Sequence, residues 1–365
     1  MSPEYVFPFQ WEAIAVLRRA MEANSKDSRA PYYLGNLLFD GQPEEAVRLW
    51  QLSAQLEPSF PIVHRNLALA YWHRTKTNDL GAAIAELEQA VAAPVKYAKH
   101  FAELDQLYGS AGAPPEKRLE LLQRNHPIVS QRDDSLSCEI GMKIFAGKYD
   151  EAIGLMTGRK FSVWEGGSLE VVQHWVNAHL LRGRREIAGG KFSAALADFE
   201  AAKAIPDNLP AEQEVGREQE IGYWVGIAEE GKGNRAEARK VWQQVANGTE
   251  KIANRRRDKS SERQAQIFYQ ALAGRKLGEE QRAQEKFRDL IQAAGRTLQG
   301  ESDEASIAGR HRDAHAALAH YLTGLSHLGL DEKEKAEAEF KLALQAAPDL
   351  LGAKAELDDL RTGQR

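Results

Sequence analysis

An internal repeat is the feature that most constrains this chain. A small residue followed four positions later by a large apolar one recurs along all 365 residues. The pairs are Ala13 and Leu17, Ala46 and Trp50, Ala83 and Leu87, Ala152 and Met156, Ala195 and Phe199, Ala238 and Trp242, Ala283 and Phe287, and Ala336 and Phe340, with Arg118 and Leu122 as a weaker copy. Residues four apart share one face of a helix, so each pair predicts a helix packed on one side. Such units cannot bury that side alone and are predicted to stack on one another.

Each of these predicted helices is the second member of a pair. A turn with Gly or Asp precedes many of them, as at 39–43 and 189–192, and another helical run precedes the turn, as at 222–230. Proline follows several second helices, as at Pro58 and Pro348, where it cannot continue the hydrogen-bond ladder. Alternating β-branched residues, the signal for strands, are nearly absent. The sequence therefore predicts an all-α fold of about nine antiparallel helix pairs.

The spacing of the repeats predicts how the chain is organised. The small residues lie 33 to 37 positions apart in the first half and 43 to 53 apart in the second. We expect an N-terminal lid and incomplete repeat in 1–24, and three to four regular units in 25–160. Longer, degenerate units are expected in 161–345, followed by a C-terminal capping helix in 346–365 that covers the end of the stack.

Composition excludes several classes of partner. The formal charge is −5, so electrostatics give no reason to expect nucleic acid. No apolar run approaches the roughly 18 to 20 residues of a membrane span, and the first residues lack the pattern of a secretory signal. The only cysteine, Cys138, excludes an internal disulfide. These features predict a cytoplasmic protein without a membrane partner.

Three stretches carry a resemblance to a known superfamily. Tyr33-Leu34-Gly35 precedes Leu38, Ala46, Trp50 and Pro58; Asn66-Leu67-Ala68 precedes Tyr71, Ala83, Leu87 and Ala90; and Thr323-Gly324 precedes Ala336, Phe340, Ala343 and Pro348. This arrangement resembles the tetratricopeptide repeat (TPR). The resemblance implies a right-handed α-solenoid whose first helices line a concave groove, and a non-enzymatic scaffold that binds a protein or peptide segment there.

A narrower resemblance rests on several short runs. They are residues 2–9, 32–36, 65–68, 103–108, 131–134 and the Trp-Glu-Gly-Gly run at 164–167. They are similar to the TPR tail of large bacterial proteins that carry an upstream mutarotase-like β-sandwich. In that family Phe-His-Pro usually precedes Trp-Glu-Gly-Gly, whereas Phe161-Ser162-Val163 stands here. The alternative function is therefore an accessory region of a carbohydrate-active protein, with an upstream domain docking near Tyr5 to Trp11.

Candidate binding residues lie on the first helices of the regular units, at positions that face the groove in the superfamily. They are Tyr32, Asn36, Phe39, Arg65, Asn66, Leu69, Trp72, Lys99 and Gln106. Asn36, Asn66 and Lys99 match three places of a clamp with which some TPR proteins hold a partner's terminal carboxylate. Tyr32 and Glu103 stand where the clamp has two further basic residues. The alternative interpretation is that Asn66, Tyr32 and Trp72 serve local packing.

The remaining motifs indicate no chemistry. Trp164 and Glu165 interrupt the helical pattern and are candidates for a loop contact with a ligand or domain, or for a tight structural turn. His311, His315 and His320 lack the partners that complete a metal site, so neither metal nor cofactor is expected. Phosphate-binding loops, nucleophile elbows and His-Glu-x-x-His motifs are absent from the sequence, which predicts a protein that is not an enzyme.

Overall fold

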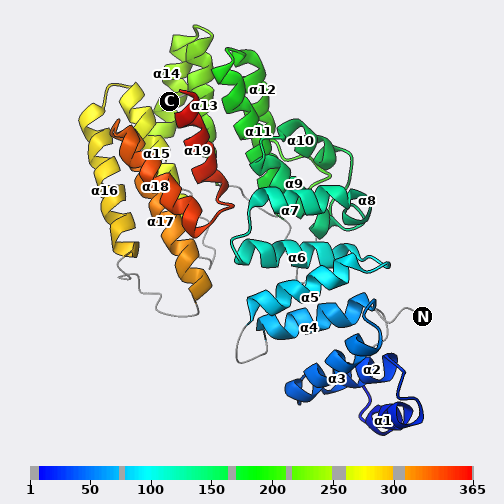
Figure 1. The fold of residues 1–365 in the computed structure, drawn as a ribbon. Coiled ribbons are helices and arrows are strands. Elements are labelled where there is room, and N and C mark those ends of the chain that lie inside the picture. The colour runs from blue at the N-terminus through cyan, green and yellow to red at the C-terminus, as the bar shows by residue number, and fades with distance from the viewer. Residues whose placement is uncertain are drawn as a thin grey trace. The chain divides into compact units, whose positions relative to one another are not determined.

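The fold is built from α-helices that follow one another as hairpins (Figure 1). The computed structural model describes residues 8–73, 79–162, 170–210, 216–248, 260–298 and 309–363. Every regular element in these ranges is a helix, so the predicted all-α helical-repeat fold is confirmed. Within the same ranges, no helix is both long enough and apolar enough to cross a membrane.

The chain divides into two compact units. Unit 1 comprises Met1–Ala113 and Lys117–Glu139, and unit 2 comprises Pro114–Glu116 and Ile140–Arg365. The helices of unit 1 are α1 (Ala13–Ala23), α2 (Arg29–Leu38), α3 (Pro43–Leu56), α4 (Pro61–His73), α5 (Leu80–Ala92), α6 (Ala98–Ser110), most of α7 (Pro115–Arg124) and α8 (His126–Val129). The division falls within α9 (Asp133–Phe145). The predicted boundary at residue 160 marks a change in repeat length and stays a prediction.

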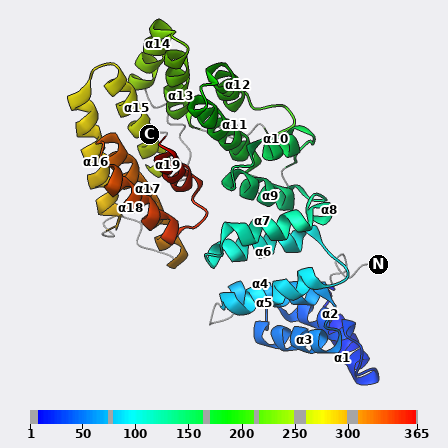
Figure 2. The same ribbon diagram turned by 45° about the horizontal axis from the view of Figure 1, so that its top comes forward.

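Unit 2 continues the alternation of first and second helices (Figure 2). Its first helices after α9 are α11 (Val171–Ala188), α13 (Glu218–Gly231), α15 (Ser260–Lys276) and α17 (Gly309–Gly329). Its second helices are α10 (Tyr149–Thr157), α12 (Phe192–Lys203), α14 (Arg235–Ala246), α16 (Glu280–Leu298) and α18 (Lys333–Ala346), and α19 (Leu351–Thr362) ends the chain.

A glycine on the first helix packs against the aromatic residue of the second helix in several hairpins. A Cβ atom on Gly35 would lie 2.5 Å from Trp50 Nε1, and one on Gly226 would lie 2.2 Å from Trp242 Nε1. Only a residue without a side chain lets the two helices approach this closely. The same contact joins Gly183 to Phe199 and Gly324 to Phe340. The aromatic members of the sequence repeat therefore hold these four hairpins together.

The irregular repeat member, Arg118, has its own partner. Its Nε and Nη2 atoms each lie 2.8 Å from a carboxylate oxygen of Asp105 on α6, and both residues are buried. Two parallel charge-assisted hydrogen bonds satisfy a cation that occupies the place of an alanine. The hairpin of α6 and α7 thus replaces an apolar contact with an ion pair.

The predicted C-terminal helix is present as α19, and it packs against α18 and α17. Residues 350–360 are all buried or half-buried, so this helix has no fully exposed side. Residues 1–7, most of the predicted N-terminal lid, lie outside the described residues, whereas Phe9 and Trp11 are exposed.

Candidate functional site

Tyr32, the first of the predicted groove residues, lies inside unit 1. Its side chain is 1% exposed and meets the Phe60 ring edge-on at 4.9 Å between centroids. Burial raises the pKa of its hydroxyl. The expectation that Tyr32 faces a partner is therefore wrong, because the ring fills the space between α2 and α4 where Trp50 also packs.

Asn36 and Asn66 lie side by side, as the clamp pattern requires, but they bind each other. Asn36 Oδ1 accepts a hydrogen bond of 2.9 Å from Asn66 Nδ2 and another of 3.0 Å from Trp50 Nε1. These bonds link α2, α3 and α4. Phe39 also packs on Trp50, with ring centroids 4.9 Å apart. A role for either amide in gripping a partner stays a prediction.

The remaining apolar and amide candidates lie on α4 and α6. Leu69 and Trp72 are half-buried on α4, whereas Gln106 is exposed on α6. The structure leaves part of each side chain accessible, and their contact with a partner stays a prediction.

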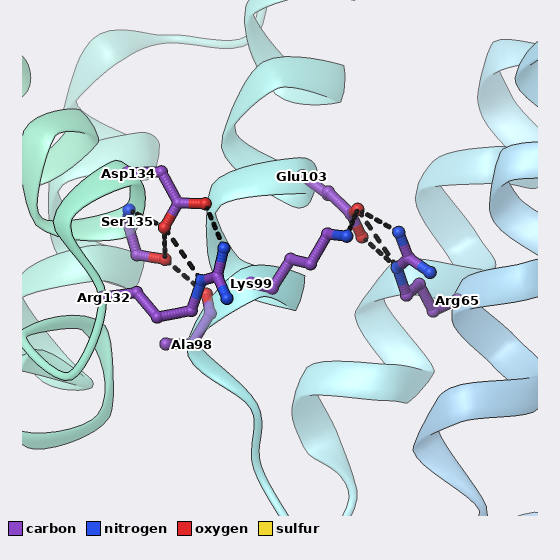
Figure 3. Close-up of polar contacts among 7 residues, drawn as sticks. All are labelled: Arg65, Ala98, Lys99, Glu103, Arg132, Asp134 and Ser135. Carbon is purple, nitrogen blue, oxygen red and sulfur yellow. Dashed lines mark hydrogen bonds and ion pairs between the residues drawn. The ribbon is translucent and has the colours of Figure 1, made fainter. Parts of the chain in front are cut away.

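Arg65 and Lys99 come together at one carboxylate (Figure 3). Arg65 on α4 binds Glu103 on α6 through Nε to Oε2 at 2.8 Å and Nη2 to Oε1 at 2.7 Å. Lys99 lies one turn before Glu103, with its Nζ 3.9 Å from Oε1. The two-point bond to Arg65 fixes Glu103, which leaves Lys99 with the more distant contact.

Arg132 adds a second ion pair beside Lys99, at the start of α9 (Figure 3). Its Nη2 atom donates to Asp134 Oδ2 at 2.9 Å. Ser135 Oγ donates to the carbonyl oxygen of Ala98 at 2.8 Å and so ties α9 to the first turn of α6. Residues 131–134 were part of the narrower family resemblance, but Arg132, Asp134 and Ser135 were not among the expected binding residues, because the small-and-large pattern marks second helices and carries no signal for this helix start.

We call Arg65, Lys99, Glu103, Arg132 and Asp134 the basic cluster. It contains three cations and two carboxylates, and its electrostatic effect is visible on the neighbouring groups. Burial and then the charge of Arg65 lower the pKa of Lys99, although Glu103 opposes them. Burial, Arg65 and Lys99 together lower the pKa of His100 to about 3. Burial is the larger cause of both shifts, and the charges of Arg65 and Lys99 add to it at His100.

Two other sequence candidates have simple outcomes. Trp164 and Glu165 lie outside the described residues. His320 Nδ1 lies 2.7 Å from Glu339 Oε2 and so links α17 to α18. In the part of the chain that the structure describes, no group of three or more His, Cys, Asp or Glu side chains is placed to hold a metal ion.

The recurrent fit of a first-helix glycine against a second-helix aromatic shows that several hairpins repeat one packing arrangement. The chain folds as a series of α-helical hairpins that resemble tetratricopeptide repeats. No protein-family model matches it.

Among solved structures, it is similar to YrrB, described as a TPR protein with an unusual peptide-binding site, at 17% identity and a TM-score of 0.33, over 63% of this chain and 91% of that one. It is also similar to a TPR protein from Parabacteroides merdae at 14% identity and a TM-score of 0.30, over 95% and 99% of the two chains. A third match, at 12% identity and a TM-score of 0.43, is a chain of Naa15/Naa10 bound to HypK-THB, over 96% of this chain and 63% of that one.

Proposed function

We propose that this chain is a non-enzymatic interaction scaffold, and that the first helices of unit 1 bind a protein segment that presents a carboxylate to the basic cluster. The observation that carries the proposal is the position of Lys99. Its side chain is 43% exposed, its nearest carboxylate oxygen is 3.9 Å away, and two arginines stand beside it.

A partner's carboxylate can form a charge-assisted hydrogen bond with Lys99 while the pairs Arg65–Glu103 and Arg132–Asp134 stay intact. Arg65 and Arg132 are already held by Glu103 and Asp134, so the site needs little rearrangement when a ligand binds. Such preorganisation reduces the entropy that binding costs.

Neighbouring residues on the first helices extend the proposed surface beyond one charge. The Asn36 to Asn66 bond joins α2 to α4, the Arg65 to Glu103 bond joins α4 to α6, and the Ser135 to Ala98 bond joins α6 to α9. Half-buried Leu69 and Trp72 on α4 offer apolar area beside this polar row. A peptide lying across these helices would therefore meet apolar contacts and one cationic anchor.

A peptide selection tests the proposal with the full chain. A random peptide library is selected on the wild-type protein, and the affinity of each enriched peptide is measured by isothermal titration. We expect acidic peptides whose affinity falls at least tenfold in Lys99→Glu, because a hydrogen bond to a charged group contributes about 1.5 to 3 kcal/mol. Lys26→Glu, an equal charge change at an exposed residue of unit 1, is the control and should keep the wild-type affinity.

Peptides that bind both variants equally well would contradict the assignment of Lys99. The affinity of the same peptides is measured for Arg65→Ala and Asn66→Ala. Full affinity in both variants would show that the first helices of unit 1 do not form the binding surface. The accessory role beside a carbohydrate-active domain stays a prediction of the sequence.

A further inference from the structure

Helix α19 lies along one side of unit 2, the side formed by the first helices of the hairpins in that unit. Both ribbon views show α19 beside α11, α13, α15 and α17 (Figures 1 and 2). Its residues 350–360 are all at least half-buried, as expected for a helix surrounded by others. We call the side of α11, α13, α15 and α17 that meets α19 the inner face of unit 2.

Two carboxylates on α19 bind one arginine of the inner face. Nη2 of Arg184 on α11 lies 3.0 Å from Glu356 Oε1 and 2.5 Å from Asp359 Oδ2. The side chains of Arg184 and Glu356 are 5% and 1% exposed. The Arg184 guanidinium also lies 4.8 Å from the centroid of the Trp224 ring on α13. The acidic residues are three apart, so they project from the same face of the helix.

The rest of the inner face is polar and aromatic. Glu220 on α13 accepts a hydrogen bond of 3.0 Å from the Tyr269 hydroxyl on α15 and is paired with Arg217. Tyr321 on α17 lies so close to the start of α19 that a Cβ on Gly352 would be 2.7 Å from its ring. Four consecutive first helices thus present side chains toward one helix.

The contacts of α19 are apolar as well as charged. Ala353 and Leu357 are buried and Leu351 and Leu360 are half-buried, whereas α18 buries Ala336, Phe340 and Ala343 in its hairpin with α17. Buried ion pairs specify a partner more than they add net stability, because each charge loses its hydration. Helix α19 thus packs against α18, the helix before it, and in addition places two carboxylates on a buried arginine of α11.

We propose that the inner face of unit 2 is a binding surface for an acidic amphipathic helix, and that α19 is its internal occupant. The helix that fits has two carboxylates one turn apart, as at Glu356 and Asp359, with a small residue and a leucine beside them, as at Ala353 and Leu357. A partner helix of this chemistry competes with α19 for Arg184. This proposal concerns unit 2 and does not depend on the function proposed for unit 1.

Cleavage after folding tests the proposal on the intact chain. A protease recognition sequence is inserted after Asp349, which is exposed between α18 and α19. The full chain is purified and then cut, so that α19 stays only by non-covalent contacts. A fluorescent peptide of residues 349–363 is the probe. We expect it to replace the resident helix in the cut protein and to bind the uncut protein at least 100-fold more weakly, because covalent attachment gives α19 a high effective concentration.

Two peptide variants with the same charge change supply the matched control. Glu356→Lys should weaken binding about 100-fold or more, since it removes one of the two carboxylates on Arg184 and places a second cation beside that buried guanidinium. Asp358→Lys should change binding less than about threefold, because Asp358 pairs with Lys354 of α19 itself. Arg184→Met in the protein should remove the difference between the wild-type and Glu356→Lys peptides.

Three results would overturn the proposal. The first is unfolding of the cut protein, seen by circular dichroism, once α19 leaves, which would make α19 a core element. The second is a peptide that does not bind the folded, cut protein from which α19 has been washed. The third is equal binding of the Glu356→Lys and wild-type peptides, which would remove the charge recognition.

Discussion

The first helices of the two units carry similar cations in opposite surroundings. In unit 1, Lys99 is substantially exposed beside Arg65 and Arg132. In unit 2, Arg184 is buried under α19 and held by Glu356 and Asp359. Both units use the same helix hairpins, so the repeat does not determine whether its first helices are accessible. A segment outside the hairpins, α19, makes the difference.

The largest effect expected from this comparison concerns the buried charge of unit 2. Arg184→Met removes the cation that faces two carboxylates, Glu356 and Asp359, and should lower the free energy of unfolding by about 3 to 5 kcal/mol. Lys99→Met in unit 1 should change the free energy of unfolding by less than about 0.5 kcal/mol, because the wild-type ammonium group is partly hydrated and its ion pair with Glu103 is long. Urea titration of the two variants measures both values.

The double variant Arg184→Met with Glu356→Leu separates charge from packing. It removes the more deeply buried of the two carboxylates that Arg184 faces and should recover most of the lost stability. Equal losses in the single and double variants would show that the shape of Arg184, and not its charge, holds α19.

Unit 1 also contains a buried ion pair, between Arg118 and Asp105, and the same comparison of single and double variants can be made there. Arg118→Ala restores the small residue found in the other repeats but leaves Asp105 buried and unpaired, so we expect a loss of about 3 kcal/mol in urea. Adding Asp105→Leu should return stability to within about 1 kcal/mol of the wild type, because the hairpin becomes apolar. A double variant as unstable as Arg118→Ala would contradict this explanation of the irregular repeat.

The basic cluster predicts an acid sensitivity of unit 1. Folding lowers the pKa of His100 from 6.5 to about 3, through burial first and then through Arg65 and Lys99. Between these values the unfolded chain binds more protons, so stability falls as the pH falls below about 6.5. Lowering the pH from 7.5 to 5 should cost about 2 kcal/mol through this residue alone.

Urea titrations of the wild type and His100→Gln at both pH values measure that contribution, since the other titrating groups are common to both proteins. The variant should lose about 2 kcal/mol less on acidification. An identical pH dependence in both would mean that His100 is not held neutral.

The last comparison concerns a feature that the units share, the glycine contact within hairpins. Gly226→Ala in unit 2 and Gly35→Ala in unit 1 should each cost about 1 to 3 kcal/mol in chemical denaturation, because the new methyl group meets Trp242 or Trp50. Gly154→Ala on α10 has open space around the added carbon and should instead stabilise by about 0.5 to 1 kcal/mol. Stabilisation by all three would show that the hairpins are less tightly packed than the structure indicates.

The sequence predicted the hairpins well because their signal is local. Ala46 and Trp50 are four residues apart, and the helix that they share determines their common face. Tyr32 was misassigned because an inward aromatic and a groove aromatic have the same spacing on a first helix. The partner of Arg184 lies on α19, 175 residues away at Asp359, and no periodic pattern connects two positions so distant.

Hydrogen exchange measured by mass spectrometry on the full chain tests the central claim most directly. If the inner face of unit 2 holds α19 through Arg184, α19 amides exchange as slowly as those of α11, and Arg184→Met accelerates exchange in α19 while α4 and α6 keep their wild-type rates. Rapid exchange throughout α19 in the wild-type protein, or an Arg184→Met variant with α19 still fully protected, would contradict the account.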